Sequence, residues 1–106
     1  MQFDFHNAKL GATCNSDQNM RAAFGAQVTR IIQRLFFSLK SAPTLAHVPS
    51  TPPVSKQYLN DRDDPCFVIG PNESSSVYFV AEEQGSSAWN EITTITIIQV
   101  GGRDGS

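Results

Sequence analysis

The sequence predicts an α+β domain in which two helices pack on one face of a mainly antiparallel sheet. Three features lead to this prediction: an alternating N-terminal segment, a strongly amphipathic helix in the first half, and several strand-like segments joined by short turns in the second half. A chain of 106 residues falls within the size range of one domain with one hydrophobic core. We assign residues 1–100 to that domain and expect residues 101–106 to form a flexible tail.

The N-terminal segment predicts a strand followed by a short helix. Residues Gln2–Phe5 alternate polar and aromatic side chains, which places both Phe rings on one face of a strand. Ser16 and Asp17 can cap a helix, because their side-chain oxygens can accept hydrogen bonds from the amides of the first turn. This helix is expected to end near Phe24, where Gly25 interrupts the pattern.

The strongest helix signal runs from residue 26 to residue 40. Its apolar residues recur at spacings of three and four, which is typical of an amphipathic helix. With the residue at 24 they form one stripe that consists of Phe24, Val28, Ile31, Ile32, Leu35, Phe36 and Leu39. Arg30, Arg34 and Phe37 fall on the opposite side. We expect the helix to end before Pro43, because proline disfavours helical backbone in the preceding residue.

A proline-marked connector leads to the predicted strands. They are Val54–Leu59, Cys66–Ile69, Ser76–Val80 and Ile92–Val100. Turn-forming residues at 60–61 and 70–72 separate the first three. The last strand is rich in β-branched residues and is apolar on both faces near its end. We therefore expect it to be central in the sheet or covered on both sides.

The overall charge argues against a general electrostatic attraction to nucleic acid. The formal net charge is −2 and the isoelectric point is near 5.5, whereas such attraction depends on many Lys and Arg side chains. Any contact with RNA must come from a local patch. The first ten residues lack the apolar run of a signal peptide, and no stretch approaches the length of a membrane span. We expect a cytoplasmic protein.

The cysteines and histidines do not indicate a metal site. Cys14 and Cys66 lie far apart in the sequence, and only His6 and His47 could join them as soft ligands. We expect no metal and no cofactor. Both cysteines are expected to be reduced, with at least one packed as a small hydrophobic residue.

Three collinear stretches carry a family resemblance. They are FGAQVTRIIQRLFFSLKSAP at 24–43, TLAHVPSTPP at 44–53 and WNEITTITIIQV at 89–100. Leu59, Phe67 and Phe79 also fall, without a gap, where the family places Leu, Phe and Phe. The chain thus resembles the HigB/RelE superfamily of toxins from type II toxin-antitoxin systems, in particular the branch of plasmid-maintenance killer proteins.

This resemblance implies both a fold and an activity. The implied fold is RelE-like: an N-terminal strand and two helices packed on a curved, mainly antiparallel sheet, with RNA bound on its concave face. The implied activity is endonucleolytic cleavage of mRNA at the ribosome by a microbial toxin that a small antitoxin, for example a helix-turn-helix protein, neutralises. In the ribonuclease members, Lys, Arg, His or Tyr side chains activate the ribose 2′-hydroxyl, stabilise the phosphate and protonate the leaving oxygen.

The basic phrase of the family is mostly absent from this sequence. Gln57 stands where the family has His, and Asn60 and Asp64 stand where it has Lys. Asp63 occupies an Arg position, although the adjacent Arg62 can replace that Arg after a slip of one residue. Since carboxylates repel a phosphate that cations attract, we expect weak or absent RNA cleavage.

Two further family positions are also replaced. Ser76 stands where the family has an Arg, and residues 102–104 (Gly, Arg, Asp) stand where it has Asp-Tyr-His. Arg62 is our candidate catalytic residue, and Lys56 and Arg103 are candidate phosphate contacts. Charged residues in turns and tails are most often only solvated, and this reading stays open for all three.

The outward face of the long helix is a second candidate surface. Arg30, Arg34 and Phe37 can contact RNA or a partner protein, or they can form an ordinary solvated face with one exposed Phe. Elsewhere, Tyr58 can donate a proton, although its alternation with Leu59 favours cross-strand packing. Neither histidine has a catalytic partner nearby in the sequence.

Three functions remain open from the sequence. The leading hypothesis is a toxin that cleaves mRNA, or a catalytically weakened homologue. The alternative is a non-catalytic module of the same fold that holds an antitoxin or another protein, which the acidic loop 61–64 and Ser76 favour. Inhibition of DNA gyrase, as in the ParE branch of the superfamily, is the third, and no residue favours it.

Overall fold

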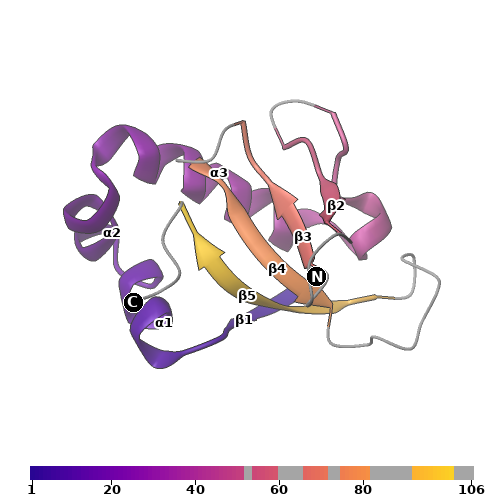
Figure 1. The fold of residues 1–106 in the computed structure, drawn as a ribbon, viewed down its shortest axis with the longest axis horizontal. Helices are drawn as coiled ribbons and strands as arrows, with labels where there is room; N and C mark the ends of the chain where they lie inside the picture. Colours follow the sequence, from indigo (N-terminus) through magenta and orange to yellow (C-terminus); the bar gives the residue numbers. More distant parts are fainter. Residues whose placement is uncertain (52–53, 60–65, 72–74, 82–91, 102–106) are drawn as a thin grey trace.

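The computed structural model describes residues 1–51, 54–59, 66–71, 75–81 and 92–101. In these residues the chain forms three α-helices, one 3-10 turn and five strands (Figure 1). The first half contains β1 (Gln2–Phe5), α1 (Ala8–Cys14), α2 (Asp17–Phe24), α3 (Ala26–Ser41) and the 3-10 turn η1 (Leu45–His47). The second half contains β2 (Gln57–Leu59), β3 (Cys66–Ile69), β4 (Val77–Ala81) and β5 (Thr94–Val100). The predicted α+β class is confirmed.

The strands of the described residues form one open sheet in the order β1-β5-β4-β3-β2. Strand β1 runs parallel to β5, and the other neighbours pair antiparallel, so the sheet is mainly antiparallel, as predicted. Strand β5 lies between β1 and β4, which confirms the predicted central position of the last strand. Strand β2 is shorter than predicted, because Ser55 has a φ of 52° and interrupts the extended backbone before Gln57.

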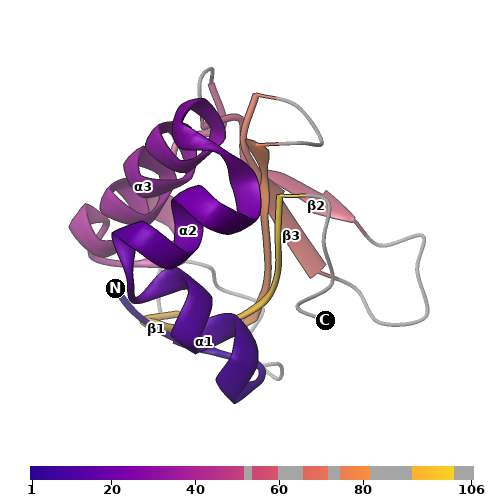
Figure 2. The same cartoon turned by 90° about the vertical axis from the view of Figure 1, so that its left-hand side faces the viewer.

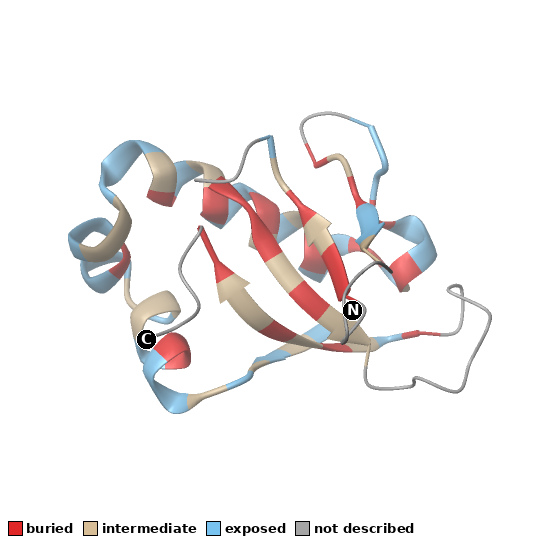
Figure 3. Ribbon diagram, viewed as in Figure 1, coloured by how far each residue is buried: buried red, intermediate tan, exposed pale blue. Residues whose placement is uncertain are grey.

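The helices lie together on one face of the sheet (Figure 2). Between the two layers lies the hydrophobic core, to which α3 contributes Ile32, Leu35 and Leu39. Figure 3 shows buried residues concentrated along β3, β4 and β5 and on the inner side of α3. From β4 and β5, Val77, Phe79, Ile95, Ile97 and Val100 are all 0% exposed. This burial confirms the prediction of one core under a helical layer.

Helix α1 was not predicted, so the expectation of two helices was wrong. Asn7 caps this helix by accepting a hydrogen bond from the Leu10 amide at 2.7 Å. Leu10 and Gly11 are its buried residues, and Gly11 lies against the Phe5 ring. A helix of seven residues with a central glycine shows no clear amphipathic repeat. In the sequence, only the N-cap residue Asn7 and the apolar Leu10 indicated this helix.

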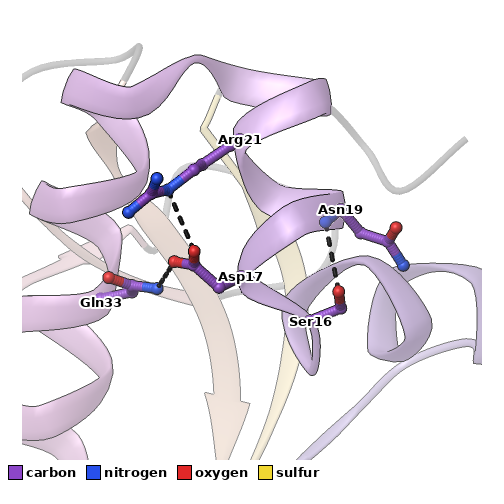
Figure 4. Close-up of polar contacts among 5 residues, drawn as sticks. All are labelled: Ser16, Asp17, Asn19, Arg21 and Gln33. Carbon is purple, nitrogen blue, oxygen red and sulfur yellow. Dashed lines mark hydrogen bonds and ion pairs between the residues drawn. The ribbon is translucent and has the colours of Figure 1, made fainter.

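Polar contacts cap helix α2 and link it to α3 (Figure 4). As predicted, Ser16 is the N-cap, and its hydroxyl accepts a hydrogen bond from the Asn19 amide at 3.2 Å. Asp17, in the first turn, forms an ion pair with Arg21 at 3.0 Å and accepts a hydrogen bond from the Gln33 amide group at 2.7 Å. Because Gln33 belongs to α3, this carboxylate links the two helices.

Helix α3 buries its apolar stripe and ends where the sequence predicted. Its C-cap, Ala42, has extended backbone with ψ 127°, as the following proline requires. The Phe36 ring packs against Phe3 and Phe5 with centroid distances of 5.5 and 6.0 Å. These rings join α3 to β1 and confirm that the two Phe residues of β1 share a face. On the outer side, Phe37 is 72% exposed.

The two cysteines are free thiols, as expected. Cys66 is buried in β3 with 1% exposure. Cys14 is partly buried at the end of α1, and this burial raises the pKa of its thiol to about 11. None of the helices in the described ranges is long and apolar enough to cross a membrane.

Thr29 on α3 presents a stability test. It is 1% exposed, and its hydroxyl has no hydrogen-bond partner among the described residues. A buried hydroxyl without a partner costs about 1–3 kcal/mol. We predict that Thr29→Val, which replaces the hydroxyl by a methyl group, raises the free energy of unfolding by about 1 kcal/mol in urea denaturation. Thr29→Ser is the matched control, because it keeps the hydroxyl and should be destabilising. A less stable Thr29→Val variant would contradict the prediction.

Candidate functional site

Strand alternation divides the sheet into two chemically different faces. Successive residues of a strand point to opposite faces. Phe67, Ile69 and Phe79 belong to the core under the helices. The residues between them, among them Val68 and Tyr78, therefore point to the face that no described helix covers (Figure 2). We call this second face, which carries Val68 and Tyr78, the open face.

The open face contains a cavity of about 300 Å³, which we call the sheet cavity. Three neighbouring strands and the residues next to them form its wall. The lining residues are Ser55, Gln57, Leu59, Val68, Gly70, Pro71, Ser76 and Tyr78. Along each strand these positions are two residues apart, as alternation requires for one shared face. None of these eight residues is acidic or basic at neutral pH, so the wall is polar without being charged.

One row of paired residues crosses the open face at the cavity. Gln57 in β2 pairs with Val68 in β3, and Val68 pairs with Tyr78 in β4. Tyr78 in turn pairs with Gln99 in β5. The first three line the sheet cavity, with the side chain of Gln57 exposed and those of Val68 and Tyr78 half-buried. The row thus places an amide group, an aliphatic group and a phenol side by side.

Two unusual backbone conformations shape the rim of the cavity. Ser55 has a φ of 52° and Gly70 a φ of 131°. The Gly70 amide donates a hydrogen bond to the Val54 carbonyl at 2.7 Å, which holds the end of β3 against the segment before β2. A Cβ at Gly70 would lie 2.7 Å from the Ser76 Cα and would also meet the Ser75 carbonyl oxygen. Glycine is therefore required at this rim position.

The fold brings together two positions that the family resemblance singled out. Gln57 stands where the family has His, and Ser76 where it has Arg; both line the sheet cavity. Tyr78 lines the same cavity but was missed by sequence reasoning. Its alternation with Ser76 along one strand was the available signal.

Lys56 does not face the sheet cavity. It is 8% exposed, and its ammonium donates a hydrogen bond to the Leu45 carbonyl at 2.9 Å. Burial lowers the pKa of this ammonium below its ordinary value of 10.5. This position does not support the predicted contact with RNA phosphate, because the charge is directed at η1. The alternation of residues in the predicted strand Val54–Leu59 could not show that the Lys56 side chain is buried against η1.

Of the other predicted site residues, the structure describes only the three on α3. Arg62 and Arg103 fall outside the described residues. Arg30, Arg34 and Phe37 are exposed on the outer side of α3, on the opposite side of the sheet from the cavity. The structure thus separates the helix surface from the cavity, and the two candidate surfaces cannot bind one small ligand together.

Tyr58 and the histidines are also away from the sheet cavity. The Tyr58 ring packs on its register partner Phe67 with a centroid distance of 4.9 Å, which confirms the predicted cross-strand packing. The His47 ring shares a hydrogen bond of 2.9 Å with the Thr44 hydroxyl in the connector, and His6 is exposed after β1. Within the described ranges, His, Cys, Asp and Glu side chains form no group of three that could hold a metal ion.

Comparison with known proteins gave no relative: the chain matches no protein-family model, no curated protein and no solved structure.

Lys56 makes stability depend on pH in a testable direction. Because burial lowers its folded-state pKa, the unfolded chain binds more protons between that value and 10.5. The contribution of Lys56 to the free energy of unfolding is fully present above pH 10.5 and is lost as the pH falls through its folded-state pKa. We predict that the free energy of unfolding of the wild type minus that of Lys56→Met increases as the pH rises towards 10.5. The same comparison with Gln27→Met, which removes no titratable group from an exposed position, should stay flat. A flat or falling difference for Lys56→Met would refute this assignment.

Proposed function

We propose that the chain is a divergent homologue of the HigB/RelE toxins, with a RelE-like fold and a curved sheet whose open face binds mRNA. It acts in the cytoplasm, at the ribosome, as the toxin component of a toxin-antitoxin pair, and its endoribonuclease activity is weakened. A small antitoxin neutralises it.

One observation carries this proposal: Gln57 and Ser76 line the same cavity on the open face. They are not neighbours in the sequence, and the resemblance places them where the family has His and Arg. The pairing of β2, β3 and β4 brings both positions to one face of the sheet, as a shared site requires. Their meeting on the sheet face opposite the helices supports an RNA site there.

The residues of the sheet cavity provide part of the required chemistry. The Gln57 amide can donate a hydrogen bond to a phosphate oxygen. The Tyr78 hydroxyl can both donate and accept a hydrogen bond. A neutral donor forms a hydrogen bond about half as strong as a charged one. Developing charge on the phosphate is therefore stabilised less than by His and Arg. Arg62 remains the candidate cation for this site.

Restoring the missing histidine should strengthen cleavage. General acid-base catalysis contributes about 10²- to 10⁴-fold to a rate. We predict that Gln57→His raises the number of new mRNA 5′ ends after induced expression by at least about 10-fold over the wild type, and that it slows growth further. The readout is 5′-end mapping at equal soluble expression. Arg62→Ala should reduce the cleavage of both forms.

Gln27→His is the matched control, because it introduces the same side chain at an exposed position of α3. It should behave like the wild type. Unaltered growth and intact transcripts for both wild type and Gln57→His, at confirmed soluble expression, would refute the endoribonuclease proposal.

A second candidate function is a non-catalytic module that holds a protein partner. The observation that favours it is Phe37, which is 72% exposed between positively charged residues on a helix with no acidic residue. Arg and aromatic residues are enriched at the centres of protein interfaces. Arg30 and Arg34 lie on the same outer side of α3.

This alternative predicts loss of a complex rather than loss of cleavage. Phe37→Ala should weaken co-purification with the product of the adjacent gene by at least about 10-fold, since truncation of an interface hot spot costs 2 kcal/mol or more. Gln18→Ala, exposed on α2, should leave the complex intact. Equal recovery of the partner with both variants would exclude this surface as the interface.

A further inference from the structure

Strand β1 has a free edge on the side that faces away from β5. It is a terminal strand in the sheet order β1-β5-β4-β3-β2 (Figure 1). The amides of Gln2 and His6 donate to backbone carbonyls in and next to β5 at 2.9 and 2.8 Å, so the even-numbered positions bond to β5. Because this bonding alternates along a strand, the amide and carbonyl groups of Phe3 and Phe5 point to the free edge.

This free edge lacks the features that usually prevent a second strand from pairing. Proteins protect such edges with proline, lysine or a bulge. Strand β1 contains neither proline nor lysine, and it pairs with β5 in an unbroken register. The other terminal strand, β2, differs, because Ser55 interrupts the backbone before it and the Lys56 amide donates to the Pro49 carbonyl at 3.0 Å. Of the two edges of the described sheet, that of β1 is therefore the one open to another strand.

The side chains of β1 indicate which strand fits this edge. Asp4 and His6 are exposed, and alternation places both on the open face. Among the described residues, neither side chain has a hydrogen bond or an ion pair. An antiparallel copy of β1 centred on Phe5 places Asp4 opposite His6 of the second copy, and the reverse. Since an imidazole N–H donates to a carboxylate, the strand is complementary to itself.

Other registers of the same pairing are less favourable. Centred on Asp4, it places two carboxylates opposite each other, and centred on Phe3, it leaves His6 without a residue opposite. In the register centred on Phe5, the two Phe5 backbones exchange a pair of hydrogen bonds across the axis. Phe3 then lies opposite Asn7, whose backbone is extended with φ −142° and ψ 162° and can continue the ladder.

We propose that β1 pairs with β1 of a second copy of this chain, antiparallel and centred on Phe5, so that two sheets join across a twofold axis. Each contact therefore occurs twice. A ladder from Phe3 to Asn7 is short beside the roughly 20–30 residues that each partner contributes to a standard interface. The dimer is thus weak and forms as the concentration rises. The inference goes beyond the proposed function and is independent of it, because β1 contributes no residue to the sheet cavity.

The first test measures the mass of the full chain by sedimentation velocity from micromolar to millimolar concentration. The mass should rise from that of one chain to that of two. Hydrogen exchange of the Phe5 amide should slow in proportion to the dimerised fraction, because this amide points to the free edge and is bonded only in the dimer. A chain that stays monomeric throughout would overturn the proposal and leave this edge to a strand of another protein. A dimer with unchanged Phe5 exchange would also overturn it.

Variants assign the interface to the two polar contacts. Asp4→Lys and His6→Glu should each raise the Kd of the dimer by about 10-fold, because each change removes both symmetry-related contacts. The double variant Asp4→Lys with His6→Glu restores opposite charges across the axis and should return the Kd to near that of the wild type. Gln18→Lys, exposed on α2, is the control and should leave the Kd unchanged. Single variants that dimerise like the wild type, or a double variant as weak as the single ones, would each refute this pairing.

Discussion

Hydrogen bonding of β5 to β1 on one side and β4 on the other is the interaction on which the structure depends. It joins the first strand of the chain to the last and makes one sheet of both halves. Ile95 and Ile97 of this strand are fully buried under the helices. Phe3 and Phe5, held beside them by the parallel pairing, then contact Phe36 of α3. The helical layer is therefore anchored to the sheet through β1 and β5.

The same pairing determines the opposite face. Because alternate residues of a strand point in opposite directions, burying Phe67 and Phe79 under the helices forces Val68 and Tyr78 outward. A slip of one residue would exchange the two sets and place a phenol in the core. The cavity is thus a consequence of core packing, and its rim depends on the positive φ of Gly70, where a side chain would collide with the backbone of Ser75 and Ser76, just before β4.

In the residues that the structure describes, charge is distributed unlike that of a typical RNA-binding domain. The described cavity wall is neutral, Lys56 is turned inward to Leu45, and the exposed cations of α3 lie on the other side of the sheet. Binding through the phosphate backbone would require cations near the cavity. A contact with a protein on α3 needs far fewer cations. This separation allows the cavity and the outer surface of α3 to act independently.

The sequence by itself determined the α+β class, both longer helices, the Ser16 cap, the central last strand and the outward position of Phe37, because periodicity and capping are local. It missed α1, whose seven residues carry almost no pattern, and the start of β2, where Ser55 turns the backbone. Only the tertiary structure decided that Lys56 is buried and that Ser76 and Tyr78 meet Gln57 in one cavity. Those facts depend on which strands pair and in what register, and pairing joins residues too distant in sequence for any local pattern to report.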